Sequence, residues 1–431
     1  EYDQPPIKGA VTEQEAILLD APPNPKVRMS YDFFGNVNSI SDPNGHTTSY
    51  SYDSTNTFVE IETNAKGHET QFYYDPGTGN LLSTTDPNGL QTTYTYDSFG
   101  RNVREIREYD SDTFPTAGYE YQLNGSSPVE IKVMSRKDHG NAETFDSYSY
   151  YDGFGRVVQQ KKESESNDLI TNDFYYDLMG RIQRVSIPYL SEKGFSSGDT
   201  TQPFTNLSFD SLGRLTETRY PDNTTKLTYP AAFALWVFSQ NNPYPWKDYD
   251  YNIHNHRTNI YFDAYKRITK VVEHNDGKGY GTWYRYDAQG NLINITDAEE
   301  NQMLYSYDSL GRKTKMIDPD MGTWSYEYDP KGNLIKQTDN AGNTVSIAYD
   351  ELDRPLKRVS EDGNTTYIYD NPVKGTLSGI KGPGFEKTFS FDRRNRLINE
   401  TMSIGGQDFT TSFSYNAQDS VNETQLPSGE K

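Results

Sequence analysis

The chain has 431 residues, a formal net charge of -21 and no cysteine. This charge offers no basic surface to nucleic acid or an anionic membrane, and the lack of cysteine excludes disulfides, thiol nucleophiles and thiolate metal sites. Only 33% of the residues are hydrophobic, but 35 tyrosines, 20 phenylalanines and 4 tryptophans are more aromatics than a disordered chain contains. Because tyrosine can bury its ring and keep its hydroxyl in water, the composition favours thin sheets with a large wet surface. No membrane-spanning segment is predicted, since no apolar run reaches the required length.

The main signal along the chain is a repeat whose units each contain a Tyr-Asp pair, or a Phe-Asp or Tyr-Asn variant of it. Most pairs follow one another after 20 to 25 residues, and two longer gaps are divided by degenerate copies at Tyr121 and Tyr229. Self-similarity at such a period is the signature of a repeat architecture, here with about seventeen units. The pairs begin at Tyr31, Tyr52, Tyr74, Tyr96, Tyr151, Tyr176, Phe209, Phe262, Tyr286, Tyr307, Tyr328, Tyr349, Tyr369, Phe391 and Tyr415.

The repeat divides the chain into four parts that we expect to form one continuous array. Residues 1–30 are a lead-in segment, interpreted as a degenerate repeat, and residues 31–230 carry repeats with insertions. Residues 231–261 are an irregular insert with two of the four tryptophans, and residues 262–431 carry regular repeats. Neither end has the features of a cap over exposed strand edges, so we expect the array to be an internal part of a longer shell.

Each unit contains two turn signals, and therefore two short strands. The first follows the aromatic residue and reads Asp, two residues, Gly, as in "DSFG" at 97–100 and "DSLG" at 308–311. Asp at the first turn position can bond forward to the backbone, and Gly accepts a positive φ at the end, so this pattern predicts a hairpin reversal. The second signal comes ten or eleven residues later, as in "DPNG" at 42–45 and "DNAG" at 339–342.

The strand before each Tyr-Asp pair alternates aromatic or apolar residues with polar ones. Tyr305 and Tyr307, and Tyr326 and Tyr328, are examples of such pairs. Alternate residues of a strand share a face, so we expect one aromatic stripe that joins neighbouring units. The returning strands are polar on parts of both faces, which indicates a single sheet that forms a wall rather than a sheet packed inside a conventional β-sandwich. We expect the inserts at 135–146 and 189–204 to be solvated loops on this wall.

Residues that could carry chemistry are few and mostly have a structural explanation. His46 and His68 occupy the same place after a turn Gly, which favours a role in the repeat. "HNH" at 254–256 would put two imidazoles on one strand face, but a metal site needs a third ligand, for which Asp250 and His274 are only guesses. The 62 acidic residues give no reason to choose a catalytic pair, and no phosphate loop, nucleophile elbow or calcium-binding loop is found. We therefore predict no catalytic residue, no cofactor site and no metal site.

The units "YDSFGRNV", "YDGFGRVV", "YDLMGRIQ", "FDSLGRLT" and "YDSLGRKT" resemble the Rhs or YD-repeat family. The stretch from 316 to 343 is similar to the repeat region of the B component of bacterial insecticidal toxin complexes, among SpvB-like proteins. The resemblance implies an all-β fold, in which an antiparallel β-hairpin array spirals into part of a hollow shell. The self-cleaving closing segment of the family is not found, and the turns at Asp42 and Asp86 share letters with it without taking its role.

Three functions follow as hypotheses. The resemblance implies a non-catalytic, secreted or cell-surface bacterial shell that encapsulates a C-terminal toxic polypeptide, with that polypeptide and further shell or toxin-complex subunits as partners. An adhesive repeat array that binds glycans or proteins is the alternative, because the aromatic residues of β-repeats can form binding surfaces. An enzyme is the least favoured, since no set of convergent titratable groups can be nominated.

Overall fold

The computed structural model describes residues 10–19, 23–123, 125, 127–164, 168–229, 246–251, 257–275 and 277–430. These residues form one 36-stranded sheet and no helix. There is accordingly no helix in the described part that is long and apolar enough to cross a membrane. Consecutive strands pair antiparallel along the chain, except that β16 adds to the side of β14 and β17 pairs with β15. The prediction of an all-β, antiparallel hairpin array is confirmed.

The strands of the first half are β1 (Glu13–Glu15), β2 (Lys26–Tyr31), β3 (Val37–Ser41), β4 (Thr47–Tyr52), β5 (Val59–Thr63), β6 (Glu69–Tyr74), β7 (Leu81–Thr85), β8 (Gln91–Tyr96), β9 (Asn102–Ile106), β10 (Ala117–Gln122), β11 (Val129–Arg136), β12 (Thr144–Tyr151), β13 (Val157–Glu163), β14 (Leu169–Tyr176), β15 (Ile182–Ser186), β16 (Tyr189–Ser191), β17 (Phe204–Phe209), β18 (Leu215–Arg219) and β19 (Thr225–Tyr229).

The strands of the second half are β20 (Trp246–Tyr251), β21 (Arg257–Phe262), β22 (Ile268–Asn275), β23 (Lys278–Tyr286), β24 (Leu292–Thr296), β25 (Gln302–Tyr307), β26 (Lys313–Asp318), β27 (Gly322–Tyr328), β28 (Leu334–Thr338), β29 (Thr344–Tyr349), β30 (Pro355–Ser360), β31 (Gly363–Tyr369), β32 (Leu377–Gly382), β33 (Phe385–Phe391), β34 (Leu397–Ile404), β35 (Gln407–Tyr415) and β36 (Val421–Gln425). β20 lies inside the range 231–261, β21 extends one residue beyond it, and the two strands pair with each other.

The predicted turns occur where the sequence places them. In the turn after Tyr307, the Asp308 carboxylate accepts the backbone N–H groups of Leu310 and Arg312, both at 2.9 Å, and Gly311 has a φ of +78°. The register shifts by one residue at the Tyr of each such turn, as between Ser306 and Tyr307. A bulge of this kind strengthens the local twist of a hairpin. The turn residues therefore both reverse the chain and curve the sheet.

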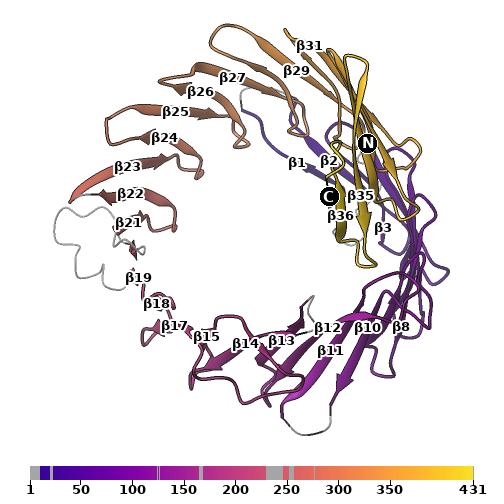
Figure 1. Ribbon diagram of the computed structural model, residues 1–431. Helices are drawn as coiled ribbons and strands as arrows, with labels where there is room; N and C mark the ends of the chain where they lie inside the picture. Colours follow the sequence, from indigo (N-terminus) through magenta and orange to yellow (C-terminus); the bar gives the residue numbers. More distant parts are fainter. Residues whose placement is uncertain are drawn as a thin grey trace.

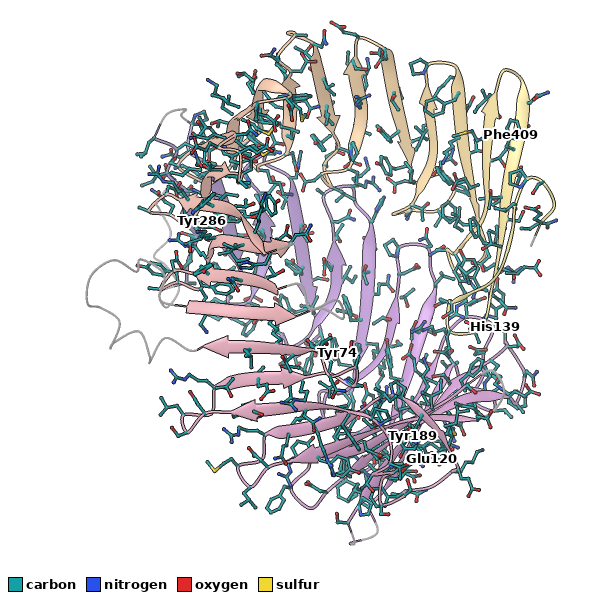
Figure 2. The ribbon with its side chains drawn as sticks, turned by 60° about the vertical axis from the view of Figure 1, so that its left-hand side comes forward. Tyr74, Glu120, His139, Tyr189, Tyr286 and Phe409 are labelled. Carbon is teal, nitrogen blue, oxygen red and sulfur yellow. The ribbon has the colours of Figure 1, made fainter. Side chains whose placement is uncertain are left out.

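A meander places alternate turns on opposite edges of its sheet. One edge carries the Tyr-Asp turns and is called the YD edge; the other carries the second reversals and is called the opposite edge. In Figure 1 the sheet runs round an open centre, and the yellow C-terminal strands reach the indigo N-terminal ones. Figure 2 shows the C-terminal strands above the N-terminal ones. Contacts between residues 285 and 312 positions apart confirm that the sheet passes over its own start. The sheet is thus a spiral of more than one circuit.

The described sheet is a single layer with almost no enclosed core. β27 and β31 both alternate between half-buried and exposed residues along their whole length. The buried hydrophobic residues are Ala117, Tyr148, Tyr150, Leu169 and Ala417. This agrees with a wall, because each face of the sheet lacks a second layer to pack against.

The one local thickening of the described wall lies at β12–β14 and contradicts one prediction. The segment 189–204 is not a solvated loop, because its β16 pairs with β14. The buried Lys161 donates from Nζ to Ser191 Oγ at 2.9 Å and to the Glu192 carbonyl at 2.8 Å. Burial lowers the pKa of Lys161, and burial next to Asp173 raises the pKa of Tyr189 to about 12. The expected loop is therefore a cover over buried polar groups.

The second insert also differs from its prediction. Arg136 and Thr144, inside the range 135–146, belong to β11 and β12, which leaves only residues 137–143 as a loop. Arg136 is buried, and its guanidinium donates to the carbonyls of Pro115, Asn141 and Ala142 at 2.9 to 3.0 Å. The loop is thus fastened by a cation inside the sheet rather than solvated.

Candidate functional site

The seam is the line along which the opposite edge of the first circuit meets the YD edge of the second circuit. On the first side lie the turns at 42–46, 64–68 and 86–90 and the loops at 107–116 and 137–143. On the second side lie the Tyr-Asp turns that begin at Asp308, Asp329, Asp350, Asp370, Asp392 and Asn416. The turns of the second side follow one another after 20 to 24 residues, and those of the first side after 21 or 22 residues as far as the loop at 107–116, so successive turns can meet one after another.

The contacts across the seam are almost all polar. Asn44 Nδ2 donates to Asp329 Oδ2 at 2.9 Å, and Asn395 Nδ2 donates to Asp86 Oδ2 at 2.8 Å. Asn88 and Lys374 exchange two hydrogen bonds, because Asn88 Nδ2 donates to the Lys374 carbonyl and the Lys374 N–H donates to Asn88 Oδ1. Further seam contacts join Leu19 to Ser309, Lys66 to Glu351, Arg107 to Asp419, Lys137 to Ala417 and Thr116 to Gln418.

Within each circuit, neighbouring units are joined by the tyrosine and the arginine of the repeat. Tyr307 Oη donates to the Leu292 carbonyl of the preceding unit, and Tyr328 does the same to Lys313, both at 2.8 Å. The Arg312 guanidinium pairs with Asp308 in its own turn and lies 5.2 Å from the ring centre of Tyr328 in the next unit. Neighbouring units are thus joined through a tyrosine hydroxyl and an arginine guanidinium, while the continuous aromatic stripe stays a prediction.

Arg354 joins two neighbouring Tyr-Asp turns of the second circuit beside the seam. Its guanidinium pairs with Asp350 and Asp370 at 2.6 Å each, and the Asp350 side chain is only 1% exposed. Arg354 lowers the pKa of Asp370 to about 2, with the Gly375 N–H as a further donor. Burial by itself would raise the pKa of Asp350, but hydrogen bonds from Arg354 and the turn backbone outweigh it and lower that pKa. Lys66 and His68 of the first circuit lie beside these carboxylates.

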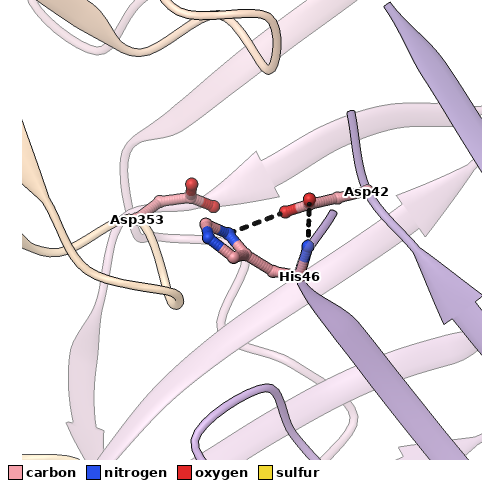
Figure 3. A group of neighbouring side chains, drawn as sticks. All are labelled: Asp42, His46 and Asp353. Atoms are coloured by element: carbon pink, nitrogen blue, oxygen red, sulfur yellow. Dashed lines mark hydrogen bonds and ion pairs between the residues drawn. The ribbon is translucent and has the colours of Figure 1, made fainter. Parts of the chain in front are cut away.

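One group of seam residues has the composition of a metal site. Asp42, His46 and Asp353 have ligand atoms within 4.8 Å of one another, and Figure 3 shows them facing each other across the two circuits. The Lys331 ammonium, however, lies 2.8 Å from Asp42 Oδ2 and also pairs with Asp353. The lysine ammonium already lies against both carboxylates and balances one of their two negative charges. The chemistry of this group is therefore an ion-pair bridge between circuits.

The residues singled out from sequence take structural positions wherever the structure describes them. His46 and His68 do occupy equivalent places after turn glycines, and both lie in the seam. Asp42 and Asp86 open second-reversal turns and accept seam hydrogen bonds or ion pairs. His254 and His256 lie outside the described residues, while His274 Nε2 lies 3.0 Å from Asn259 Nδ2.

The seam was missed by the sequence analysis because its partners are about 300 residues apart. One signal could have indicated it: Asn44, Lys66 and Asn88 occupy the third position of three successive second reversals and are all polar. Such a row needs a partner row of matching period, and only the curvature of the whole sheet determines which turns supply it.

A single-layer sheet of two-strand units that spirals and joins its own edge defines a YD-repeat shell. The chain belongs to the teneurin YD-shell family, whose model matches residues 13–312 and 294–381. The search of the curated proteins found no match to the sequence.

Solved structures of a bacterial toxin complex share this fold. A crystal structure of TcdB2-TccC3 has a TM-score of 0.75 at 14% identity and covers 97% of this chain and 26% of its own. The same protein without its hypervariable C-terminal region gives a TM-score of 0.78 at 14% identity, with 97% and 28% covered. The Tc holotoxin pore of Photorhabdus luminescens gives 0.68 at 14% identity, with 97% and 30% covered. The chain thus spans less than a third of the length of these structures.

Proposed function

We propose that this chain is a non-catalytic wall segment of a hollow shell that encloses a toxic polypeptide and is exported with it. The observation that supports this most is the single-layer sheet that runs round an open centre and joins its own edge at the seam (Figure 1). A wall whose faces contact water suits this task, because it needs no thick hydrophobic core. Its polar surface also offers few apolar contacts to which an enclosed polypeptide would bind.

The structural likeness to TcdB2-TccC3 supports the same role. On this basis the proposed partners are the enclosed polypeptide and subunits of a toxin complex. The shell and the polypeptide that it encloses are, in this proposal, both secreted or held at the cell surface. Residues of the described seam act as fasteners in this proposal and not as catalysts. They hold one circuit on the next so that the enclosed polypeptide stays inside.

The test is electron cryomicroscopy of the natural polypeptide that carries these 431 residues, combined with limited proteolysis. We expect a hollow body with polypeptide density inside, and a fragment that proteases reach only after the seam variant Arg354→Met is introduced. A particle without a cavity, or a cavity without a protected fragment, would contradict the proposal. Binding of the same protein to a glycan array would instead support the adhesive alternative.

A further inference from the structure

Three of the four histidines in the described part of the chain lie in the seam. His46 and His68 end two second reversals of the first circuit, and His139 lies in the loop at 137–143. In Figure 2, His139 lies below Phe409, where the C-terminal strands reach the N-terminal ones. Imidazole is the side chain that ordinarily changes its charge between about pH 5 and about pH 8. The seam therefore contains groups that can respond to mild acid.

His139 lies between a carboxylate of its own circuit and two guanidinium groups of the other circuit. Its Nδ1 lies 3.1 Å from Oδ1 of Asp110 in the neighbouring loop. Its Nε2 lies 3.3 Å from Arg394 Nη1 and 3.4 Å from Arg396 Nη1, both of the second circuit. A carboxylate accepts hydrogen bonds and a guanidinium only donates them, so these partners require a proton on Nδ1 and none on Nε2. The closed seam thus fits the neutral imidazole.

A second proton on His139 would have to enter at Nε2, against the two guanidinium groups. Donors would then face donors, and the arginines would lose the acceptor that joins the two circuits here. The Arg394 side chain is only 4% exposed. Burial lowers the pKa of Arg394 and repulsion from Arg396 and Arg107 lowers it further, while Asp419 works in the opposite direction. Another positive charge would therefore be added beside a buried cation that is already destabilised.

The other charged groups around His139 do not reverse this preference. Arg396 also pairs with Asp392 in its own turn, and Arg107 pairs with Glu105 in its own circuit. The groups on the first circuit stay near His139 whether the circuits touch or not, so they act on the closed and the open seam alike. Besides Asp110 and Arg107, these groups are Tyr109, whose ring centre lies 5.3 Å from the imidazole, the buried Arg136, Lys137 over the Phe145 ring, and the exposed Asp138 and Glu143.

Separation of the circuits changes the partners of His139 in one direction. Arg394 and Arg396 leave with the second circuit, whereas Asp110 remains, because its side chain is fully buried and its Oδ2 accepts the Thr116 hydroxyl at 2.6 Å. The open seam therefore binds a proton on His139 that the closed seam excludes. A proton bound only by the open form stabilises that form, so this contact weakens as the pH falls through the histidine range.

His68 has the opposite relation to the seam. Its Nε2 lies 3.9 Å from Oδ2 of Asp370, a carboxylate of the second circuit, and its side chain is 9% exposed. A proton on His68 therefore strengthens the contact between the circuits, and it is lost when they separate. His46 likewise lies beside Asp353 of the second circuit, although Lys331 shares that carboxylate. Mild acid thus acts in opposite directions at the two parts of the seam.

We propose that His139 is a pH switch that opens one end of the seam. In mild acid the turns that begin at Asp392 and Asn416 separate from the loops at 107–116 and 137–143, while the turns beside His68 stay closed. The inference does not depend on what the shell encloses, because it concerns only the contact between the two circuits.

Hydrogen exchange of the full chain, followed by mass spectrometry, tests the switch at two backbone amides. Ala417 N–H donates to the Lys137 carbonyl at 3.0 Å across the proposed opening, and Lys374 N–H donates to Asn88 Oδ1 at 2.8 Å in the part beside His68. Protection factors are compared from about pH 7.5 to about pH 5.5, since they remove the intrinsic pH dependence of exchange.

One proton taken up on opening corresponds to a loss of about tenfold in closure for each pH unit below the histidine range. We expect the protection of Ala417 to fall by about this factor in the native chain, and that of Lys374 to be kept. Constant protection at Ala417 would overturn the proposal. An equal fall at Lys374 would overturn it as well, because the seam would then open as a whole.

His139→Gln is the decisive variant. The Gln amide can donate to Asp110 and accept from Arg394 as the neutral imidazole does, but it does not titrate. We expect the protection of Ala417 to become independent of pH. A purely structural loss would lower that protection by the same factor at every pH and leave its slope unchanged, so a retained slope contradicts the switch whatever the level of protection.

His68→Gln is the matched control, because it removes a seam histidine with the opposite relation to the second circuit. It should keep the slope at Ala417 and lower the protection of Lys374 only in acid. If it removes the slope at Ala417 as His139→Gln does, the response belongs to the seam histidines in general, and the assignment to His139 is rejected. Circular dichroism of both variants verifies that the sheet is folded.

Discussion

At the scale of the residue, the arginine of the repeat has a larger role than its sequence signal indicated. It binds the turn Asp of its own unit and lies over the aromatic ring of the next, as Arg156 does with Asp152 and with Tyr176 at 4.6 Å. The guanidinium can do this because it is a planar fork that also stacks on rings, which a lysine ammonium cannot reproduce. The "GR" of each unit is visible in the sequence, but the ring it meets becomes known only once the strands are paired.

Replacement of one repeat arginine should show how much burial in the seam adds to the stability that the arginine contributes. Arg354→Met leaves Asp350 buried without its partner, and removing one member of a buried pair costs about 3 to 5 kcal/mol. Arg214→Met is the matched control, because Arg214 makes the same turn contact with Asp210 on the free edge, where a pair is worth about 0 to 1 kcal/mol. Urea unfolding of both variants measures the two losses. Equal losses would show that the seam does not bury the Arg354 pair in solution.

At the scale of the element, the two-strand unit could be predicted almost completely from sequence. Asp at the start and Gly at the end of each turn are local signals, and the strand alternation between them is local as well. The insert at 189–204 could not be predicted in this way. Its cover depends on Gln159, Lys161 and Asp173, polar residues that look solvent-exposed in the sequence but are buried under the insert. Burial of polar side chains by a loop depends on tertiary hydrogen bonds, which periodicity does not encode.

The turn conformation gives a second prediction. Lys266 has a φ of +65° at a position where most units have Gly, and a side chain in that region costs about 1 to 2 kcal/mol. Lys266→Gly should therefore stabilise the sheet, by about 0.5 to 1 kcal/mol once the greater freedom of Gly in the unfolded chain is subtracted. Gly100→Ala is the reciprocal variant, because Gly100 has a φ of +75° and no atom closer than 3.8 Å to an added Cβ. It should destabilise by about 1 kcal/mol without a steric clash. Thermal unfolding measures both changes, and a shift of the same sign in the two variants would contradict the turn assignment.

At the scale of the whole molecule, the sheet spirals because each two-strand unit adds a small amount of curvature and these contributions add up along the chain. The bulge at each Tyr-Asp turn contributes to that curvature, and the number of residues in one circuit follows from the sum. A resemblance to YD-repeat proteins implied a spiral shell, but composition and periodicity alone could not place Asn44 opposite Asp329. Once the circuit closes, the seam gathers carboxylates of two circuits and the few cations that pair with them.

Acid should open the seam before it unfolds the hairpins. Arg354 lowers the pKa of Asp370 to about 2, whereas an Asp in an unfolded chain has a pKa of about 3.9. A group with a depressed pKa stabilises the folded state fully above the unfolded pKa and loses that contribution as the pH falls through the folded pKa. The window is therefore from about pH 4 to pH 2. Small-angle scattering should show the radius of gyration rising in this window while circular dichroism still shows the sheet.

Two aspartates with the same pKa separate the seam from the rest of the molecule. The pKa of Asp53, on the free YD edge, is also lowered to about 2, by hydrogen bonds from the Thr55 hydroxyl and the turn backbone. Asp53→Asn should leave the pH of opening unchanged, because Asp53 does not contact the second circuit. Asp370→Asn should move the opening to a higher pH, since His68 of the first circuit then loses the carboxylate oxygen that lies 3.9 Å from its Nε2 across the seam. Equal behaviour of the two variants would mean that acid acts on the turns themselves, and that the seam between circuits is not what holds the ring closed.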